Sequence, residues 1–408
     1  MILYSLIIHL YAFLVGLISP LHKKARLMMV GQWRTNSILR NNIDRREKYI
    51  WFHASSLGEF EQGRPLMEQI KATHPDYKIL LTFFSPSGYE VRKNYDGADV
   101  VCYLPFDTPC RVRKFLDLAN PAIAVFIKYE FWANYLVELK RRNIPTYIIS
   151  AIFNRRQVFF KWYGKSYKNV LNCFTRLFVQ DDDSRSLLAE YGVNNVDVIG
   201  DTRFDRVVDV QSQARKFPLI ERFADKDGVV LVAGSSWKDD EDIFIDYFNE
   251  HSDVRLIIAP HEIHSEHLIS IQSRLKRPFA CLSEANETNV ANKDCIIIDS
   301  FGMLSSIYRY GDIAYIGGGF GAGIHNVLEA AVYGIPVIFG PKYDKFKEAT
   351  DLLARKGAFT INDKDSFYKI MNHLRNSSDA IKSAGSNAEN YVKSNTGATN
   401  NILKRISL

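Results

Sequence analysis

Short apolar runs alternate with longer amphipathic segments along most of the chain. Between residues 49 and 200 the apolar runs are four to seven residues long, and segments with a helical period separate most of them. A polar stretch over residues 205–227 ends this pattern, which restarts at Val229. Repeated strand–helix units predict an α/β protein with two parallel, doubly wound sheets. We expect strands over residues 49–53, 78–84, 100–104, 122–127, 146–150, 177–180 and 196–199, and again over 229–233, 254–259, 295–298, 313–316, 336–339 and 358–361.

Two such sheets joined by a short linker predict two Rossmann-like domains, and 408 residues are enough to form both. Open α/β sheets bind ligands beyond the carboxyl ends of their strands, so we expect an interdomain cleft there. The loops that follow the strands should carry the functional residues, which the fold alone does not identify. The expected boundaries are residues 1–20 for an N-terminal anchor, 21–205 for the first domain, 206–226 for the linker, 227–385 for the second domain and 386–408 for a C-terminal helix.

The first nineteen residues carry no charged side chain, and His9 is the only one that titrates. A helix of this length spans about 28 Å, which is just enough for the hydrocarbon core of a bilayer. The basic cluster that begins at Lys23 should stay on the cytoplasmic side. A cleaved signal peptide would carry its charge before the apolar run rather than after it. We therefore predict a retained membrane anchor over residues 1–20, with a helix lying in the membrane interface as the alternative.

The net charge of +6 is modest, but the basic residues are unevenly distributed. Nine Lys and Arg residues and no acidic residue lie between Lys140 and Arg176, with aromatic residues interleaved among them. Such a surface suits either a nucleic acid or anionic lipid headgroups. The apolar N-terminus favours lipid, so we expect contact with membrane lipid and none with nucleic acid.

Neither the cysteines nor the acidic residues form a recognisable metal site. The five cysteines contain no CxxC pair and are typical of reduced thiols. Closely spaced Cys and His ligands are lacking in the sequence as well. We therefore expect no metal and no cofactor.

The loop after the first predicted strand, residues 53–61, combines small residues with acidic ones. Gly58 allows a ligand to approach the backbone closely, and Glu59 follows near the start of the next helix. A carboxylate at that place can take a proton from an attacking hydroxyl group, as a general base does. The alternative is an ordinary first-turn acid that interacts with the helix dipole.

The second half contains two loops suited to a nucleotide. Gly234–Ser236 follows a strand and opens a helix, although many strand–helix turns contain such residues. The glycine-rich segment 316–323 is expected to lead from a strand directly into a helix, with Glu329 one helical turn beyond His325. Amides at the start of that helix could hold a phosphate, and the carboxylate suits the two hydroxyls of a ribose. A dinucleotide fingerprint is excluded because no acid follows about twenty residues later.

The order and spacing of these residues are similar to those of bacterial Kdo transferases (3-deoxy-D-manno-octulosonic acid transferases), which are GT-B glycosyltransferases. Trp51–Glu59 resembles the first motif of that family, and residues 316–331 resemble its donor motif. The resemblance covers nearly the whole chain, with three departures. Pro260 and Met303 stand where the family has an arginine and an acid, and in residues 150–154 the arginine that the family has at the third position is displaced. Further matching segments are Thr82–Gly88, Tyr103–Asp107, Glu130–Asn134, Gly200–Asp205 and Gly340–Phe346.

The resemblance implies an inverting enzyme that moves Kdo from CMP-Kdo to a lipid A precursor, lipid IVA, in lipopolysaccharide core biosynthesis. Together with the apolar N-terminus, it leads us to expect the chain at the cytoplasmic face of the bacterial inner membrane. We expect no protein partner, and we expect the C-terminal helix to cross back to the first domain. Glu59 corresponds to the catalytic base. The implied donor-binding residues are Gly234, Ser235, Ser236, His261, Ser300, Gly302, Gly318, Gly319, Gly323, His325, Asn326 and Glu329, and the implied acceptor-binding residues are Ser56, Gly58, Ser87, Gly88, Glu130, Arg155 and Arg156.

Two other functions are compatible with parts of this pattern. A GT-B enzyme of envelope biosynthesis that uses a UDP-sugar would share the glycine-rich turn and the helical glutamate. A membrane scaffold without activity would need neither Glu59 nor Glu329. Competition of donor turnover by CMP or UDP separates the two enzymes, and a nucleotide-dependent thermal shift separates both from a scaffold.

Overall fold

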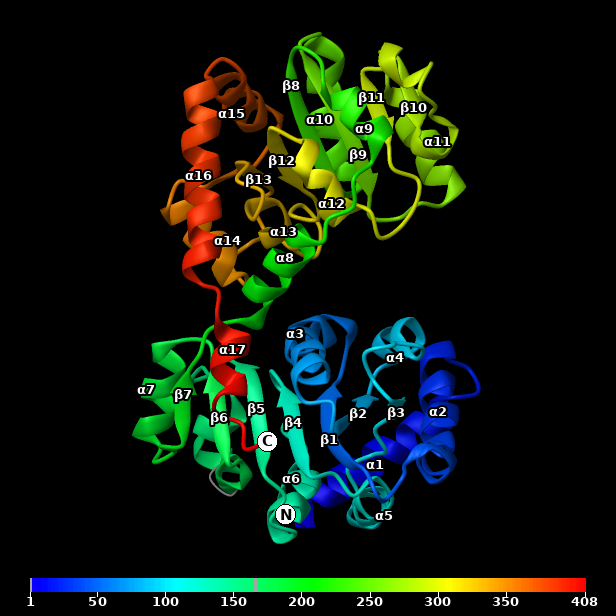
Figure 1. The fold of residues 1–408 in the computed structure, drawn as a ribbon, viewed down its shortest axis with the longest axis vertical. Helices are drawn as coiled ribbons and strands as arrows, with labels where there is room; N and C mark the ends of the chain where they lie inside the picture. The colour runs from blue at the N-terminus through cyan, green and yellow to red at the C-terminus, as the bar shows by residue number, and fades with distance from the viewer. Residues whose placement is uncertain (1, 165–166) are drawn as a thin grey trace. The chain divides into compact units, whose positions relative to one another are not determined.

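The computed structural model describes residues 2–164 and 167–408. The chain divides into two compact units, of which the first contains Met1–Arg206 and Thr396–Leu408 and the second contains Val207–Asn395. Each unit is built around one parallel sheet of seven strands (Figure 1). The expected α/β class with two Rossmann-like domains is therefore confirmed.

The sheet of the first unit has the strand order β3-β2-β1-β4-β5-β6-β7. The chain moves outward from β1 to β3 and then returns to the other side of β1 with β4, so the order reverses between β1 and β4. The strands are β1 (Lys48–Ala54), β2 (Tyr77–Phe83), β3 (Val100–Tyr103), β4 (Ile123–Ile127), β5 (Thr146–Ala151), β6 (Arg176–Val179) and β7 (Val196–Val198). The helices are α1 (Ile2–Ile18), α2 (Lys23–Asn42), α3 (Leu57–Thr73), α4 (Pro86–Arg92), α5 (Pro109–Ala119), α6 (Ala133–Arg141), α7 (Asp182–Glu190) and α17 (Ala398–Leu403).

The sheet of the second unit has the order β10-β11-β9-β8-β12-β13-β14, which reverses between β8 and β12. Its strands are β8 (Val229–Ser236), β9 (Val254–Pro260), β10 (Phe279–Cys281), β11 (Cys295–Ile297), β12 (Ile313–Ile316), β13 (Val337–Phe339) and β14 (Ala358–Thr360). Its helices are α9 (Pro218–Ala224), α10 (Lys238–Glu250), α11 (Ser265–Arg274), α12 (Leu304–Ile307), α13 (Leu328–Ala331), α14 (Lys347–Ala354), α15 (Lys364–Arg375) and α16 (Ser378–Ser394). The chain passes between the units within α8 (Thr202–Ser212) and again after α16.

The strands read as continuous apolar runs because helices cover both faces of each sheet. In β1, every residue from Tyr49 to Ala54 is buried. Trp51 lies at the centre of one layer, with its ring 5.0 Å from Phe115 and 5.2 Å from Phe126. Such packing holds the carboxyl ends of the strands rigidly, which is where the candidate site lies.

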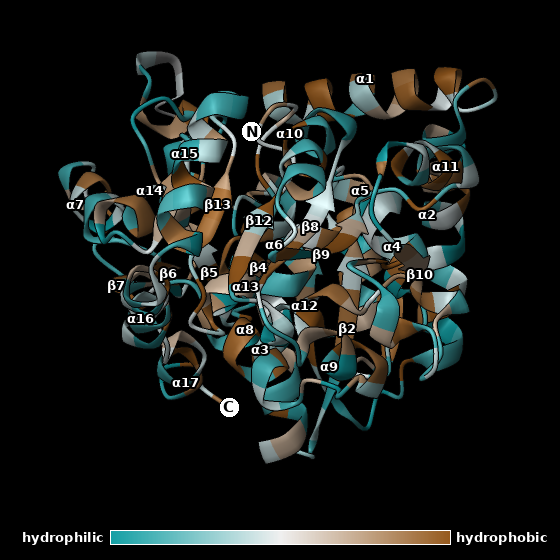
Figure 2. Cartoon of the chain, turned by 90° about the horizontal axis from the view of Figure 1, so that it is seen from above, coloured by the Kyte–Doolittle hydropathy of each residue, from teal (hydrophilic) through white to brown (hydrophobic). Residues whose placement is uncertain are grey.

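The N-terminal helix α1 lies along the surface of the first unit, where most of its length is drawn in the colour of hydrophobic residues (Figure 2). The Tyr4 hydroxyl donates a hydrogen bond to Asp107 at 2.6 Å, and the Tyr11 ring contacts Phe84 and Phe106. Among the described residues, no single helix is both long and apolar enough to cross a bilayer. Only α1 and α2 taken together satisfy those criteria, and they are bent by 117°. The membrane-spanning anchor therefore stays a prediction.

Candidate active site

Two glutamates lie at the point where the strand order of the first sheet reverses. Glu59 is in the first turn of α3, which follows β1, and Glu130 follows β4. The two strands are neighbours in the sheet, with His53 opposite Phe126. Open α/β sheets bind their ligands at this position. The structure therefore brings together Glu59 and Glu130, which are far apart in the sequence.

The Glu59 carboxylate turns back toward the loop that precedes its helix. Its Oε2 accepts hydrogen bonds from the backbone N–H groups of Ser55 at 2.6 Å and Ser56 at 3.0 Å. The carboxylate thus caps α3, as the helix-start alternative expected. Burial nevertheless raises the pKa of Glu59, and the negative charge of Glu130 raises it further, while His53 and the two amides offset only part of this.

The pKa of Glu130 is displaced in the opposite direction. Its Oε2 lies 3.0 Å from His53 Nε2 and accepts a hydrogen bond from Trp132 Nε1 at 2.5 Å. Burial works against its charge, but the hydrogen bond and charge of His53, with hydrogen bonds from Ser55 and Trp132, outweigh burial and hold the pKa of Glu130 below its usual value. Two carboxyls with pKa values displaced in opposite directions allow one to stay charged while the other exchanges a proton.

His53 is held in place by residues of the neighbouring strand. It is fully buried, and its Nδ1 lies 2.9 Å from Thr82 Oγ1. Trp51 Nε1 also donates to Thr82 Oγ1, at 2.8 Å. Because His53 and Thr82 are opposite each other in the β1–β2 register, the sheet itself fixes the orientation of the imidazole. Neither His53 nor Trp132 was among the predicted site residues, although both lie inside the motifs that the resemblance identified.

The other predicted acceptor residues are divided between the site and its surroundings. The loops after β1 and β2 lie side by side, because Ser85 N–H donates to the Ser55 carbonyl at 2.8 Å. These loops place Ser56, Gly58 and Ser87 near the carboxyl ends of the strands. Gly88 has a packing role, since an added Cβ would lie 2.3 Å from the Phe83 ring.

The basic stretch 140–176 has acidic neighbours in the fold that the sequence did not reveal. Arg155 pairs with Glu190 at 2.7 Å, and Arg176 pairs with Asp197 at 2.7 Å. The side chains of both arginines are largely exposed, and exposed ion pairs of this kind are weak. Arg156 is exposed as well, so a role for either residue of the Arg155–Arg156 pair in binding phosphate stays a prediction.

In the second unit, the helix after the glycine-rich segment begins later than expected. Strand β12 ends at Ile316, and α13 begins only at Leu328. His325 therefore precedes the helix, and the prediction that it shares a helical face with Glu329 is wrong. Asn326 explains the late start, because its Oδ1 accepts the N–H of Leu328 and its side-chain amide donates to Glu329 Oε1 at 3.1 Å.

The backbone of the glycine-rich segment packs directly against two other loops. An added Cβ on Gly317 would lie 2.3 Å from the Ser235 carbonyl oxygen, and one on Gly319 would lie 2.6 Å from the Gly340 backbone. Only glycine allows these approaches. Gly234–Ser236 and the glycine-rich segment therefore lie against each other at the carboxyl ends of β8 and β12.

Several amides expected to hold a phosphate are already paired within the protein. Gly318 N–H donates to the buried Asp240 carboxylate at 2.9 Å, and Gly323 N–H donates to the Gly318 carbonyl at 3.2 Å. Within the described part of the chain, the backbone N–H groups of Gly319, Phe320 and Ala322 have no protein acceptor. The predicted phosphate cradle is therefore smaller than the whole segment 317–323.

Three aromatic rings form a stack beside this segment. The Trp237 and His261 rings are 4.6 Å apart, and His261 and His325 are 4.5 Å apart, with interplanar angles of 28° in both cases. Burial lowers the pKa of His325 to about 4, and the proximity of His261 contributes to this shift. His325 is therefore neutral at physiological pH, and its Nε2 lies 3.4 Å from the indole N–H of Trp237.

The remaining predicted donor residues have less definite surroundings. Ser300 Oγ lies 2.9 Å from Met303 Sδ in an exposed loop, and neither Ser300 nor Asp299 caps α12. Ser236 donates to the buried Glu241 at 3.0 Å. Across residues 2–164 and 167–408, no group of three or more His, Cys, Asp or Glu side chains is placed to hold a metal ion.

Comparison with known proteins connects these residues to a family. The family model described as 3-deoxy-D-manno-octulosonic-acid transferase (kdotransferase) matches residues 26–206. A 3-deoxy-D-manno-octulosonic acid transferase of Aquifex aeolicus is 28% identical over 316 residues, which cover 76% of this chain and 80% of that protein. One from Haemophilus influenzae is 26% identical over 369 residues, covering 87% and 85%. Residues 26–206 thus form a Kdo transferase domain, and the chain is similar to Kdo transferases over most of its length.

The chain is an enzyme and a glycosyltransferase. Its fold is of the GT-B type. It is similar to the crystal structure of UDP-GlcNAc 2-epimerase from Neisseria meningitidis, with a TM-score of 0.60 and 14% identity over 87% of this chain and 98% of that one. At this identity the similarity concerns the fold alone.

Proposed function

We propose that this Kdo transferase uses CMP-Kdo as its donor and a lipid A precursor as its acceptor, with inversion at the anomeric carbon. The observation that carries the proposal is the pair of glutamates at the reversal of the first sheet. Their pKa values are displaced in opposite directions, so Glu59 is suited to accept a proton while Glu130 stays charged.

In the proposed reaction, Glu59 takes the proton of the acceptor hydroxyl as its oxygen attacks the anomeric carbon of Kdo. The bond between that carbon and the CMP phosphate oxygen breaks in the same step, and CMP leaves with the electron pair. A single displacement inverts the anomeric carbon and forms no covalent bond to the enzyme. A base works best when its pKa lies near the working pH, and the charge of Glu130 moves Glu59 in that direction.

The second unit supplies the groups suited to CMP. The N–H groups of Gly319, Phe320 and Ala322, together with the His261 ring, provide donors for a phosphate. Glu329 lies beside Asn326 at the start of α13, where a carboxylate could accept hydrogen bonds from ribose hydroxyls. The neutral His325 can accept or donate a hydrogen bond without adding charge. We expect the reaction to need no metal.

We further propose that α1 rests in the membrane interface. One face of this helix packs on the first unit through Tyr4, Ile8, Ala12 and Val15. The opposite face carries Leu3, Leu6, Leu10, Phe13 and Leu17, which are 58–71% exposed. Several large, exposed apolar side chains on one face of a helix are typical of contact with lipid or with another protein.

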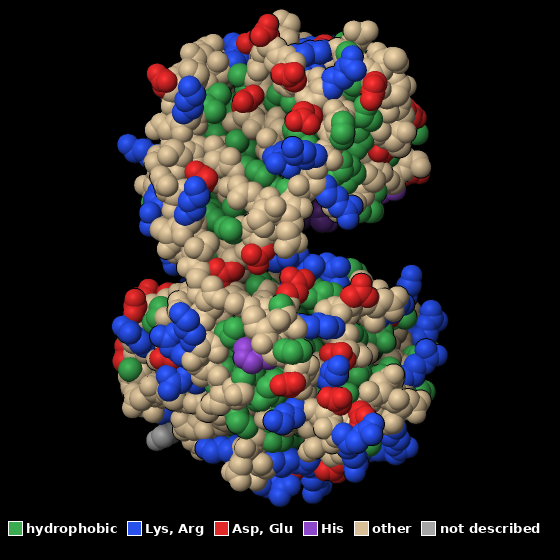
Figure 3. All heavy atoms as spheres, in the orientation of Figure 1, with side chains coloured by type: hydrophobic (Ala, Val, Ile, Leu, Met, Phe, Trp, Pro, Cys, Tyr) green, Lys and Arg blue, Asp and Glu red, His purple; other side chains and the backbone are tan. Residues whose placement is uncertain are grey.

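The charges around α1 favour lipid. Helix α6 contacts α1 through the hydrogen bond between Ser5 and Asn134, and Arg111 of α5 lies over Phe106, which in turn contacts Tyr11. Exposed basic residues are present on both helices, and Figure 3 shows Lys and Arg side chains along the edge of the first unit where Figure 1 draws α5 and α6. Cations beside an apolar face match anionic headgroups beside acyl chains. We place the enzyme at the inner membrane on its cytoplasmic side.

The test uses the purified full-length protein in anionic lipid vesicles, with CMP-Kdo and a tetraacylated lipid A precursor. The expected result is a product heavier by one or more Kdo residues and an equal amount of released CMP. Parallel reactions with UDP-GlcNAc should give no product. Transfer from the UDP-sugar without transfer from CMP-Kdo would contradict the proposed donor.

A further inference from the structure

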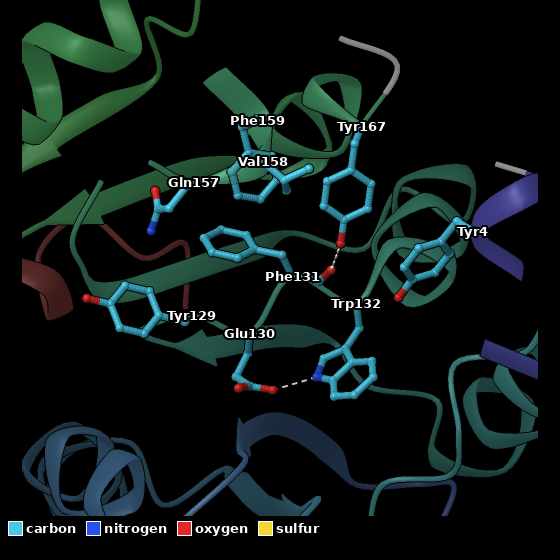
Figure 4. Close-up of a pocket in the computed structure, with 9 residues that line it drawn as sticks. All are labelled: Tyr4, Tyr129, Glu130, Phe131, Trp132, Gln157, Val158, Phe159 and Tyr167. Carbon is cyan, nitrogen blue, oxygen red and sulfur yellow. Dashed lines mark hydrogen bonds between the residues drawn. The ribbon is translucent and has the colours of Figure 1, made fainter. Parts of the chain in front are cut away.

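A cavity of about 380 Å³ lies in the first unit, with Glu130 of the glutamate pair in its wall (Figure 4). Its volume falls within the range of small-molecule sites. Six of the nine described residues that line it are aromatic, and Glu130 is the only charged one among those nine. Figure 4 shows the Phe131 and Phe159 rings along the cavity, with Tyr129, Gln157 and the Glu130 carboxylate toward one end and Tyr4 and Tyr167 toward the other.

The two ends of the cavity belong to different parts of the unit. Glu130 belongs to the glutamate pair, while Tyr4 belongs to α1, whose opposite face is apolar and exposed. Tyr4 is fixed in the wall by its hydrogen bond to Asp107, and Tyr167 by its hydrogen bond to the Phe131 carbonyl at 2.5 Å. The cavity therefore connects the proposed base region with the helix that we place in the membrane.

We propose that this cavity binds one acyl chain of the acceptor lipid. The chain would lie against Phe131, Phe159 and Tyr167, and the sugar headgroup would remain at the Glu130 end. The charged group lies at one end, and the Tyr4 and Tyr167 hydroxyls at the other end already donate to the protein. Such a lining suits an amphiphile better than a second sugar or a nucleotide, whose many polar groups would need hydrogen-bond partners. This inference rests on the proposed lipid acceptor and adds the part of the protein that recognises its hydrocarbon.

Val158 offers a way to test the cavity with little risk to the fold. It lines the cavity and is 40% exposed, so a polar side chain at this position need not be buried in the folded protein. Val137 on α6 is a matched control, because it is 41% exposed in the same unit and does not line the cavity. Val158→Asp and the neutral Val158→Asn should both weaken binding of hydrocarbon, whereas Val137→Asp should not.

The assay compares two water-soluble, monomeric acceptors that share the phosphorylated disaccharide and differ only in carrying an octanoyl or an acetyl group. No membrane is present, so attachment of α1 to lipid cannot favour either acceptor. Each methylene moved out of water contributes a factor of about 4, so the wild type should prefer the octanoyl acceptor in kcat/KM by about tenfold or more. Both Val158 variants should reduce this preference to about twofold or less by the same reasoning. Because both acceptors carry the same phosphates, any effect of the added aspartate charge on phosphate binding cancels in the ratio of their kcat/KM values.

A second measurement does not depend on transfer. Trp132 lines the cavity, so a bromo-octanoyl probe should quench its fluorescence in the wild type and in Val137→Asp, but much less in the Val158 variants. Transfer that proceeds with equal kcat/KM for both acceptors, or a preference that survives both Val158 variants, overturns the acyl-chain site and leaves the proposed function standing. Saturable quenching without any transfer of Kdo would instead support the acyl-chain site and contradict the proposed function.

Discussion

Replacing Glu59 by glutamine separates its two proposed roles. The glutamine oxygen can still accept the N–H groups of Ser55 and Ser56, so the start of α3 should be preserved. It cannot accept a proton, so the base is lost. Removing a general base typically costs 10²–10⁴-fold, and we expect a loss of about a thousandfold in kcat, or roughly 4 kcal/mol in the barrier.

Replacing Glu59 by alanine removes the cap as well as the base. The loss of a capping acceptor typically costs ~1 kcal/mol, which lowers the melting temperature by about 2–4 °C for a unit of this size. Glu59→Gln should therefore be as inactive as Glu59→Ala but closer to the wild type in melting temperature. Asp182→Asn is the matched control, because Asp182 is also a first-turn acid of the first unit but lies on α7.

The assay measures release of CMP at saturating donor and acceptor, together with the melting temperature and the affinity for CMP. Wild-type affinity for CMP in Glu59→Gln would show that the donor site is intact. Turnover within about threefold of the wild type, which corresponds to under 1 kcal/mol in the barrier, would remove Glu59 from the chemistry and leave only its capping role.

Three further predictions concern the surroundings of the reacting groups. Glu130→Gln removes the charge that raises the pKa of Glu59. Because the base works only when deprotonated, activity falls as the pH drops through that pKa, so the acid limb of the kcat/KM profile should move to lower pH in this variant. An acid limb at the wild-type pH would contradict the coupling between the two glutamates. Asp240→Asn leaves fewer acceptors for Gly318, Trp237 and Tyr315 and should raise the KM for CMP-Kdo by about tenfold, the equivalent of one lost hydrogen bond to a charged group, whereas the exposed neighbour Asp239→Asn should not. Glu329→Ala should raise the KM for CMP-Kdo with little change in kcat, and an unchanged KM would refute its role at the ribose.

The strands were predictable because burial on both faces leaves an unbroken apolar run, as residues 49–54 show. Strand β10 was missed because it contains only Phe279–Cys281, too few residues to show a period. The late start of α13 was missed for a different reason. Glycine, histidine and asparagine in the segment 317–327 are compatible with either a loop or a helix start, and the hydrogen bond from Leu328 to Asn326 decides between them only in the folded chain.

Charge partners that come from distant parts of the chain could not be predicted. The stretch 140–176 contains no acid, yet Glu190 and Asp197 lie beside two of its arginines. The role of Asp240 in the second unit could not be predicted for the same reason. In the sequence it is one of several acidic residues in the first turn of α10. Only the pairing of β8 with β12 in the fold reveals that its carboxylate accepts a hydrogen bond from the N–H of Gly318. The sequence does contain one signal for the helix-capping role of Asp240. It lies three residues beyond Trp237, at the position from which a side chain can accept the N–H at the start of its helix.

The glutamate pair also changes how Glu59 is understood. The sequence presented it as a single carboxylate, and a single carboxylate that accepts two backbone N–H groups should have a lowered pKa and be a poor base. Burial and the charge of Glu130 reverse that tendency, and Glu130 remains charged because His53, Ser55 and Trp132 stabilise it. His53 is in turn held by Thr82 on the adjacent strand. The reactivity of Glu59 therefore depends on residues from three neighbouring strands, which explains why the base belongs at the reversal of the sheet and why its helix-capping bonds do not argue against it.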